Sequence, residues 1–361
     1  MAKGSAFLRL FSGLLFFLSG ILALELGDIF TLQDRSNDGG CNDRLAVLDD
    51  WHTESIYSTD AAVTAIDNYD REVEVRRSLS VFFGIANRAR TGVNTPSYQA
   101  RMRVRENIIR VRDFLNDNPD YNRDDYLFFC DSTFFTLHER TDPALDFQGN
   151  EIRDQNGDPV PIDSVPEYRT ALNEDPDNKA WWSGDLLENM KGYFFTEYGA
   201  NYCYDDDLGV TADIQPYIQG ANGQAVTGDS KTSLIMCPHS FDRTDMPNTY
   251  RDANNLITDS PPTNLADAIP KSATFLHEMF HTLYGGYFLA GDDETYDIAA
   301  CQNLARSNPN EAEINPENYV FFIAHMYHLF GVPDANEAWS IPHQWTFRHQ
   351  GVGQNRVFGA A

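Results

Sequence analysis

The chain has 361 residues, of which 42% are hydrophobic and 13% aromatic, so it can bury a sizeable core and does not have a disordered composition. Its 27 basic side chains face 54 acidic ones, which gives a formal net charge of −27. This balance excludes nucleic acid as an expected partner, because the phosphates would be repelled.

Residues 1–23 are typical of a secretory signal peptide, with Lys3 and Arg9 at a basic start, an apolar run over 10–22 and a small residue, Ala23, for cleavage. The run is shorter than the roughly 20 apolar residues of a membrane span, which disfavours the alternative of a membrane anchor. No later stretch could cross a bilayer. We therefore expect a secreted, extracellular monomer without stable membrane insertion. In that setting most of the five cysteines should pair, leaving one over; they are Cys41, Cys130, Cys203, Cys237 and Cys301.

The first half of the chain predicts helices and one buried strand between polar segments. Residues 24–60 are polar and are expected to form a loop-rich N-terminal segment, with a removable propeptide as an open alternative. Apolar residues at helical spacing predict helices over 61–90 and about 98–115. An aromatic run predicts a strand within 126–136. The acidic, proline-rich stretch 142–177 is expected to be an insertion loop.

The second half continues with an aromatic segment over 181–198 that predicts a helix and a short apolar strand over 233–237. A further helix is predicted to begin near Lys271. There is no internal repeat and no clear boundary, so residues 61–345 are expected to form a single domain. Residues 346–361 are expected to form a C-terminal tail.

The helix that begins near Lys271 contains His277-Glu278-Met279-Phe280-His281, the pattern H-E-x-x-H. Residues four apart lie on one helix face, so His277 and His281 can direct two imidazoles at one point. Imidazole is a good zinc ligand, and a catalytic zinc has three protein ligands and a water. Glu278 could act as general base on that water. In a merely structural buried helix, this carboxylate would be costly to bury. The motif therefore predicts one catalytic Zn²⁺.

The third ligand of the predicted zinc site could come from several acidic residues. A glutamate on a later helix is one choice, with Glu311, Glu313 and Glu317 as candidates. A third histidine in the metzincin pattern is disfavoured, because Tyr287 holds its place. An aspartate within 291–297 is the remaining choice.

Residues 291–297, Gly-Asp-Asp-Glu-Thr-Tyr-Asp, resemble the signature G-T-x-D-x-x-Y-G of the deuterolysin or aspzincin family of fungal zinc metallopeptidases, which includes lysine-specific metallo-endopeptidases. Asp293 and Tyr296 occupy the D and Y positions. Residues 300–305 and 315–322 are similar to that family's A-C-x-x-L-A and N-A-x-x-Y-x-Y-F, and 233–238 to the strand before its active-site helix. The resemblance spans roughly residues 202–327. No Thr follows Gly291 and Asp297 replaces the final Gly, so Asp292 and Asp297 are rival ligands.

The resemblance implies an α+β, zincin-like fold with a small twisted sheet, an active-site helix and a mainly helical remainder. It implies a secreted zinc metalloendopeptidase that hydrolyses polypeptides, with His277, His281 and Asp293 as metal ligands. Glu278 would be the general base, and Tyr296 would form a hydrogen bond near the metal or steady the oxyanion.

Two further implications concern specificity and a rival function. Some members of the family cut before lysine, and acidic residues here could attract a basic side chain; they are Asp292, Glu294 and Asp297. The rival function is a non-catalytic, secreted zinc-binding or scavenging surface antigen. Related antigens carry H-R-x-x-H, whereas this chain retains Glu278 and has no histidine-rich tail, which favours the enzyme.

Overall fold

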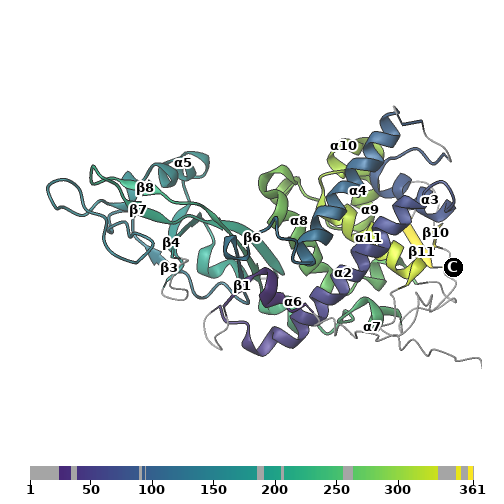
Figure 1. Cartoon of the computed structure of the whole chain (residues 1–361), viewed down its shortest axis with the longest axis horizontal. Coiled ribbons are helices and arrows are strands. Elements are labelled where there is room, and N and C mark those ends of the chain that lie inside the picture. Colours follow the sequence, from purple (N-terminus) through teal and green to yellow (C-terminus); the bar gives the residue numbers. More distant parts are fainter. Residues whose placement is uncertain are drawn as a thin grey trace, which may run out of the picture.

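The molecule joins a helical region to a region of small sheets, as Figure 1 shows, so the α+β class is confirmed. The computed structural model describes residues 24–33, 39–88, 92–93, 95–184, 191–204, 207–254, 263–331, 347–350 and 357–360. The predicted signal peptide lies outside these residues. Among the helices that are described, none is long and apolar enough to cross a membrane.

The main sheet has four strands in the order β1-β2-β9-β6. Strands β1 (Thr31–Leu32), β2 (Tyr126–Phe129) and β9 (Lys231–Met236) are parallel, and β6 (Gly209–Ile214) runs antiparallel to β9 at one edge. The predicted strands over 126–136 and 233–237 are therefore present, the first ending at Phe129. Most residues of β2 and β9 are buried, as expected for apolar strands covered on both faces.

Long helices pack together beside this sheet. They are α2 (Leu45–Asp67), α3 (Val73–Phe83), α4 (Pro96–Leu115), α8 (Ser272–Tyr284), α9 (Ile298–Ser307) and α11 (Pro316–Phe330). The helix predicted over 61–90 is in fact parts of two helices, because α2 ends at Asn68 and α3 ends at Gly84, which has φ 64°. The helix predicted at 98–115 starts slightly earlier, where the Thr95 side chain accepts a hydrogen bond from the backbone N–H of Tyr98.

The described residues of 24–60 are built into the core, contrary to the expected loop-rich segment. They contribute α1 (Leu26–Ile29), β1 and most of α2, and Trp51 is fully buried. Many buried positions of α2 are polar, which hid the helix in the sequence. Their hydroxyls bind carbonyls of their own helix: Ser55 Oγ donates to Trp51 O at 2.7 Å, and Thr59 Oγ1 donates to Ser55 O at 2.7 Å.

The small-sheet region contains the sheet β3-β4-β5, made of Thr136–His138, Lys179–Trp182 and Tyr193–Thr196, and the hairpin of β7 (Tyr217–Gln219) and β8 (Ala225–Thr227). Two predictions are wrong here. The described residues of the segment 181–198 are not helical, since its aromatic residues pair between β4 and β5. The segment 142–177 is folded: it includes α5 (Pro166–Glu174) and supplies buried residues to a second hydrophobic cluster, among them Ala144, Ile152, Ile162, Val165 and Tyr168.

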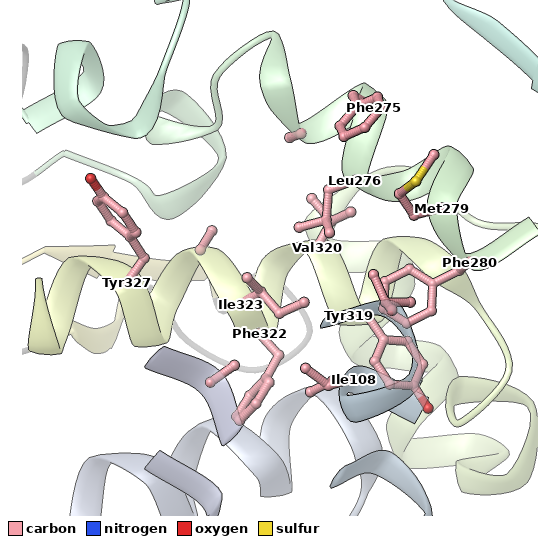
Figure 2. Packing of buried hydrophobic residues seen from close by; sticks show 14 of the residues in the cluster. Ile108, Phe275, Leu276, Met279, Phe280, Tyr319, Val320, Phe322, Ile323 and Tyr327 are labelled. Atoms are coloured by element: carbon pink, nitrogen blue, oxygen red, sulfur yellow. The ribbon is translucent and has the colours of Figure 1, made fainter. Parts of the chain in front are cut away.

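Helix α8 packs closely against α11. Figure 2 shows Leu276 and Phe280 of α8 directed toward Tyr319 and Val320 of α11. The rings of Phe280 and Tyr319 lie 4.5 Å apart, centroid to centroid. Because these side chains are all buried, the contact holds α8 in a defined rotation about its axis.

Shorter elements and two disulfides complete the fold. The elements are α6 (Pro238–Asp242), α7 (Tyr250–Asn254), α10 (Pro309–Ala312) and the antiparallel pair β10 (Phe347–Gln350) and β11 (Val357–Ala360), which lies within the predicted tail. Disulfides join Cys41 to Cys130 and Cys203 to Cys237, and Cys301 is a buried free thiol. The predicted pattern of paired cysteines with one left over is confirmed, and these disulfides are compatible with a secreted protein.

Candidate metal centre

The two faces of α8 have different surroundings. The predicted start is confirmed, because Lys271 is the N-cap residue. One face carries the apolar side chains that enter the core, at 275, 276, 279 and 280. The other face, at 274, 277, 278 and 281, lines a cavity of about 510 Å³. The helix ends at Gly285 (φ 51°), whose N–H donates to the carbonyl of His281.

Three side chains meet on the cavity side of α8. His277, His281 and Glu294 each offer a ligand atom, and these atoms all lie within 4.8 Å of one another. His277 Nε2 is 3.1 Å from Glu294 Oε1, and His281 Nε2 is 3.6 Å from Glu294 Oε2. The predicted pair of histidines therefore comes together with an acidic residue of the segment 291–297.

The acidic member of this group is Glu294, whereas the resemblance had indicated Asp293. Asp293 is exposed at the end of a short 3₁₀ helix, Gly291–Asp293. Asp297 caps α9 instead, accepting hydrogen bonds from the backbone N–H groups of Ala299 and Ala300 at 2.9 Å each. The side chain of Asp292 lies outside the described part of the chain.

The three later glutamates considered as third ligand lie outside the group of His277, His281 and Glu294. Glu311 is exposed. Glu313 forms an ion pair with Arg103, with 2.6 Å between Glu313 Oε2 and Arg103 Nε. Glu317, in the first turn of α11, lies behind the site, and its Oε2 is 3.0 Å from His277 Nδ1. A carboxylate in this position orients the imidazole and leaves its Nε2 directed at the centre.

The turn that carries Glu294 is held by Asn315, which sequence reasoning did not single out. The Asn315 side chain accepts from Thr295 N and donates to Thr295 O, both at 3.0 Å. Its amide also donates to Asn318 Oδ1 at 2.7 Å. Tyr296 donates its hydroxyl hydrogen to Glu294 Oε2 at 2.7 Å, and its ring lies 5.8 Å from that of His277. The turn thus directs Glu294 inward with Tyr296 beside it.

The donor set fits a divalent metal ion. Two imidazoles and one carboxylate are the ligands of many catalytic zinc sites, which keep a further position for water. Glu294 is only 8% exposed, and its Oε1 makes no hydrogen bond of normal geometry among the described residues despite the nearby imidazole. Such a buried carboxylate oxygen requires a positive partner.

Electrostatics in the group point the same way. Burial lowers the pKa of His277, but the adjoining carboxylates of Glu294 and Glu317 outweigh burial and raise this pKa well above its ordinary value. Burial raises the pKa of Glu294, yet the two histidines beside it lower it to about 2. Glu294 is therefore ionised beside the two imidazoles, which is the state in which a carboxylate can ligate a metal ion.

Glu278 faces the same cavity from the next position on α8. Its Oε2 accepts a hydrogen bond from Thr211 Oγ1 of β6 at 2.8 Å. Gly209 of β6 lies against this carboxylate, and a Cβ there would approach Glu278 Oε1 to 3.1 Å. Glu278, the general base that the motif predicts, is therefore held between its own helix α8 and the edge strand β6.

Comparison with family models, with curated proteins and with solved structures finds no match to this chain. The metal-binding capacity of His277, His281 and Glu294 is a property of their geometry. The side chains around that group are therefore what can favour one activity over another.

Proposed function

We propose that the chain is a secreted zinc endopeptidase of the zincin type, similar to the aspzincins. The observation that carries the proposal is Glu278, a carboxylate one residue from the first ligand of the His277–His281–Glu294 group, in the same cavity and oriented by Thr211. When bound, zinc would polarise the scissile carbonyl and lower the pKa of a bound water. In this proposal Glu294 replaces Asp293 as third ligand.

The protein's own groups would then move the proton. Glu278 accepts a proton from the attacking water and passes it to the nitrogen of the leaving amine as the peptide bond breaks. Thr211 donates to one carboxylate oxygen, Oε2, and so keeps the carboxylate facing the cavity. Glu317 holds His277 from behind, so that the imidazole keeps its direction while charge changes in front of it.

The edge strand β6 supports a polypeptide as the substrate. Its residues 209–211 line the cavity, and β6 is the last strand of its sheet. An exposed edge offers a row of N–H and C=O groups to an extended peptide. Near its far end the edge is already used, because Tyr193 and Gln215 exchange two backbone hydrogen bonds of 2.8 Å. An extended peptide pairing with residues 209–213 would place a bond beside Glu278.

The test uses purified mature protein, zinc analysis and casein hydrolysis with and without a chelator. The parent protein should bind one zinc and cleave casein, and the chelator should abolish cleavage. Glu278→Ala should retain zinc and lose cleavage, because it removes the base and none of the ligands. Asp293→Asn, a neutralised exposed acid, serves as the matched control and should behave like the parent. Bound zinc without Glu278-dependent cleavage would favour the rival zinc-scavenging function.

A further inference from the structure

We propose that Tyr202 is a further catalytic residue, whose hydroxyl is released from the edge strand when substrate binds and then donates a hydrogen bond to the scissile carbonyl oxygen. The inference rests on the proposed peptidase function. The phenol keeps its proton throughout, so the step exchanges one hydrogen-bond acceptor for another and involves no transfer of electrons or groups.

Tyr202 lines the cavity from a segment other than the helix that carries the histidines. It belongs to the 3₁₀ helix Gly199–Tyr204 and lines the same cavity as Glu278. Two contacts fix this helix. The disulfide joins Cys203 to Cys237 at the end of β9, and Cys203 N donates to Ser132 Oγ at 3.0 Å. The phenol is therefore supported by rigid neighbours, as a group that must be positioned for catalysis requires.

The hydroxyl of Tyr202 is bound to the carbonyl oxygen of Gly209, an acceptor with which a substrate peptide would pair. It donates to Gly209 O at 3.3 Å, a long hydrogen bond. Leu208 O accepts from Cys237 N on the β9 side, and carbonyls of successive residues in a strand point to opposite sides. Gly209 O therefore faces the open edge. A peptide that adds to β6 would donate an N–H to this oxygen and displace the phenol.

The displaced hydroxyl would lie beside the reacting bond. A Cβ added at Gly209 would lie 3.1 Å from Glu278 Oε1, so a peptide paired with Gly209 would pass close to the general base. The hydroxyl would then have a developing oxyanion as its nearest new acceptor. Burial raises the pKa of Tyr202, and the nearby carboxylates of Asp207, Glu278 and Glu294 add to this shift, so the phenol stays protonated as a donor.

Tyr296 is less suited to this role in the observed geometry. Its hydroxyl already donates to Glu294 Oε2 at 2.7 Å, a short bond to an ionised acceptor. Tyr202 has the longer bond, to a neutral carbonyl. In this proposal the Tyr296 hydroxyl binds the metal ligand Glu294, and the Tyr202 hydroxyl binds the carbonyl oxygen of the substrate.

The experiment compares Tyr202→Phe with Tyr198→Phe in the zinc-loaded enzyme. Tyr198 is the matched control, because its ring contacts that of Tyr202 at 6.2 Å but it is 55% exposed and is absent from the cavity lining. With an internally quenched peptide, Tyr202→Phe should lower kcat about 10²-fold, the loss typical of one oxyanion donor, with KM, bound zinc and melting temperature unchanged. Tyr198→Phe should match the parent.

A binding measurement separates this role from a structural one. A phosphinic peptide, which mimics the tetrahedral intermediate, should bind Tyr202→Phe more weakly by the same factor as the loss in kcat/KM. An uncleaved peptide should bind with equal affinity to zinc-loaded Glu278→Gln and to the double variant that also carries Tyr202→Phe. Should Tyr202→Phe fail to fold, Tyr202→His, which retains a ring donor, should keep an intermediate kcat.

The outcomes are distinct. An active parent with unchanged kcat in Tyr202→Phe, or an equal loss in Tyr198→Phe, would overturn the role of Tyr202 and leave the peptidase proposal standing. A parent that binds zinc but shows no Glu278-dependent cleavage would overturn the proposed function and this inference with it.

Discussion

His277 is held from behind by Glu317, with 3.0 Å between Nδ1 of the imidazole and Oε2 of the carboxylate. The other ring nitrogen, Nε2, faces Glu294. Glu317→Gln keeps the size of the side chain but weakens the acceptor. We expect zinc affinity to fall about 10- to 100-fold, the usual effect of removing a partner behind a ligand. Competition with a fluorescent chelator would measure this loss; an unchanged affinity would show that His277 does not need the contact.

The identity of the third ligand can be tested with two neighbouring acids. Glu294→Gln should reduce zinc binding by at least about 100-fold, because an amide is a poor ligand and the buried group loses its charge. Asp293→Asn should leave zinc binding unchanged, because Asp293 is exposed outside the group. Zinc per chain after dialysis is the measurement. The reverse result would return the ligand role to Asp293.

Asn315 should affect both stability and metal binding. Asn315→Ala leaves the backbone N–H and C=O of Thr295 without their partner, at a cost of about 1–3 kcal/mol in the free energy of unfolding. The Glu294 turn should loosen, with zinc affinity falling about 10-fold. Asn318→Ala is the control: that side chain binds the carbonyls of Phe82 and Cys301 and accepts from the Asn315 amide, but it makes no hydrogen bond to the turn itself.

Both variants should therefore unfold in less urea than the parent, and only Asn315→Ala should also lose zinc. Equal zinc affinities in variants of equal stability would mean that the turn keeps its shape without Asn315.

Glu54 is buried outside the metal site, and its raised pKa should make the stability of the protein depend on pH. Burial raises its pKa to about 7, although Ser272 Oγ donates to its Oε2 at 2.6 Å. The folded state thus holds a proton that the unfolded state releases near pH 4.5, its ordinary pKa. The contribution of Glu54 to stability is full below pH 4.5 and is lost as pH rises through about 7. The shift corresponds to about 3 kcal/mol.

Glu54→Gln should remove this contribution to the pH dependence. Urea unfolding at several pH values should show the variant gaining on the parent between pH 5 and pH 8, by up to about 3 kcal/mol. A constant difference between the two proteins across that range would show that Glu54 is ionised in the folded state throughout.

The sequence was most informative where one physical rule dominated. The H-E-x-x-H spacing and the apolar residues around it predict α8 and the approach of His277 to His281, because helical periodicity alone brings them together. The short apolar runs predict strands over 126–136 and 233–237, and the observed strands cover 126–129 and 231–236. The prediction of a helix over 181–198 was wrong because aromatic residues occur in both helices and strands. Pairing with neighbouring strands, which local sequence does not show, decides between the two.

Local sequence could not predict which acidic residue joins His277 and His281, for a different reason. Asp292, Asp293, Glu294 and Asp297 are all close in sequence, and spacing does not say which carboxylate turns inward. Asn315, 20 residues after Thr295, fixes that turn through two backbone hydrogen bonds. The sequence does place Asn315 just before Pro316, where an asparagine usually caps the helix that follows. In the structure its side chain makes no capping bond to that helix, and only the structure shows that the amide binds the Glu294 turn instead.

The early helix α2 packs against α8 and α11, which come more than 200 residues later (Figure 1). During translation α2 can pack against α4 early, but its contacts with α8 and α11 cannot form until the last third of the chain emerges. Contacts so distant in sequence make assembly slow. A truncated translation product would therefore carry the H-E-x-x-H sequence without the assembled group of His277, His281 and Glu294.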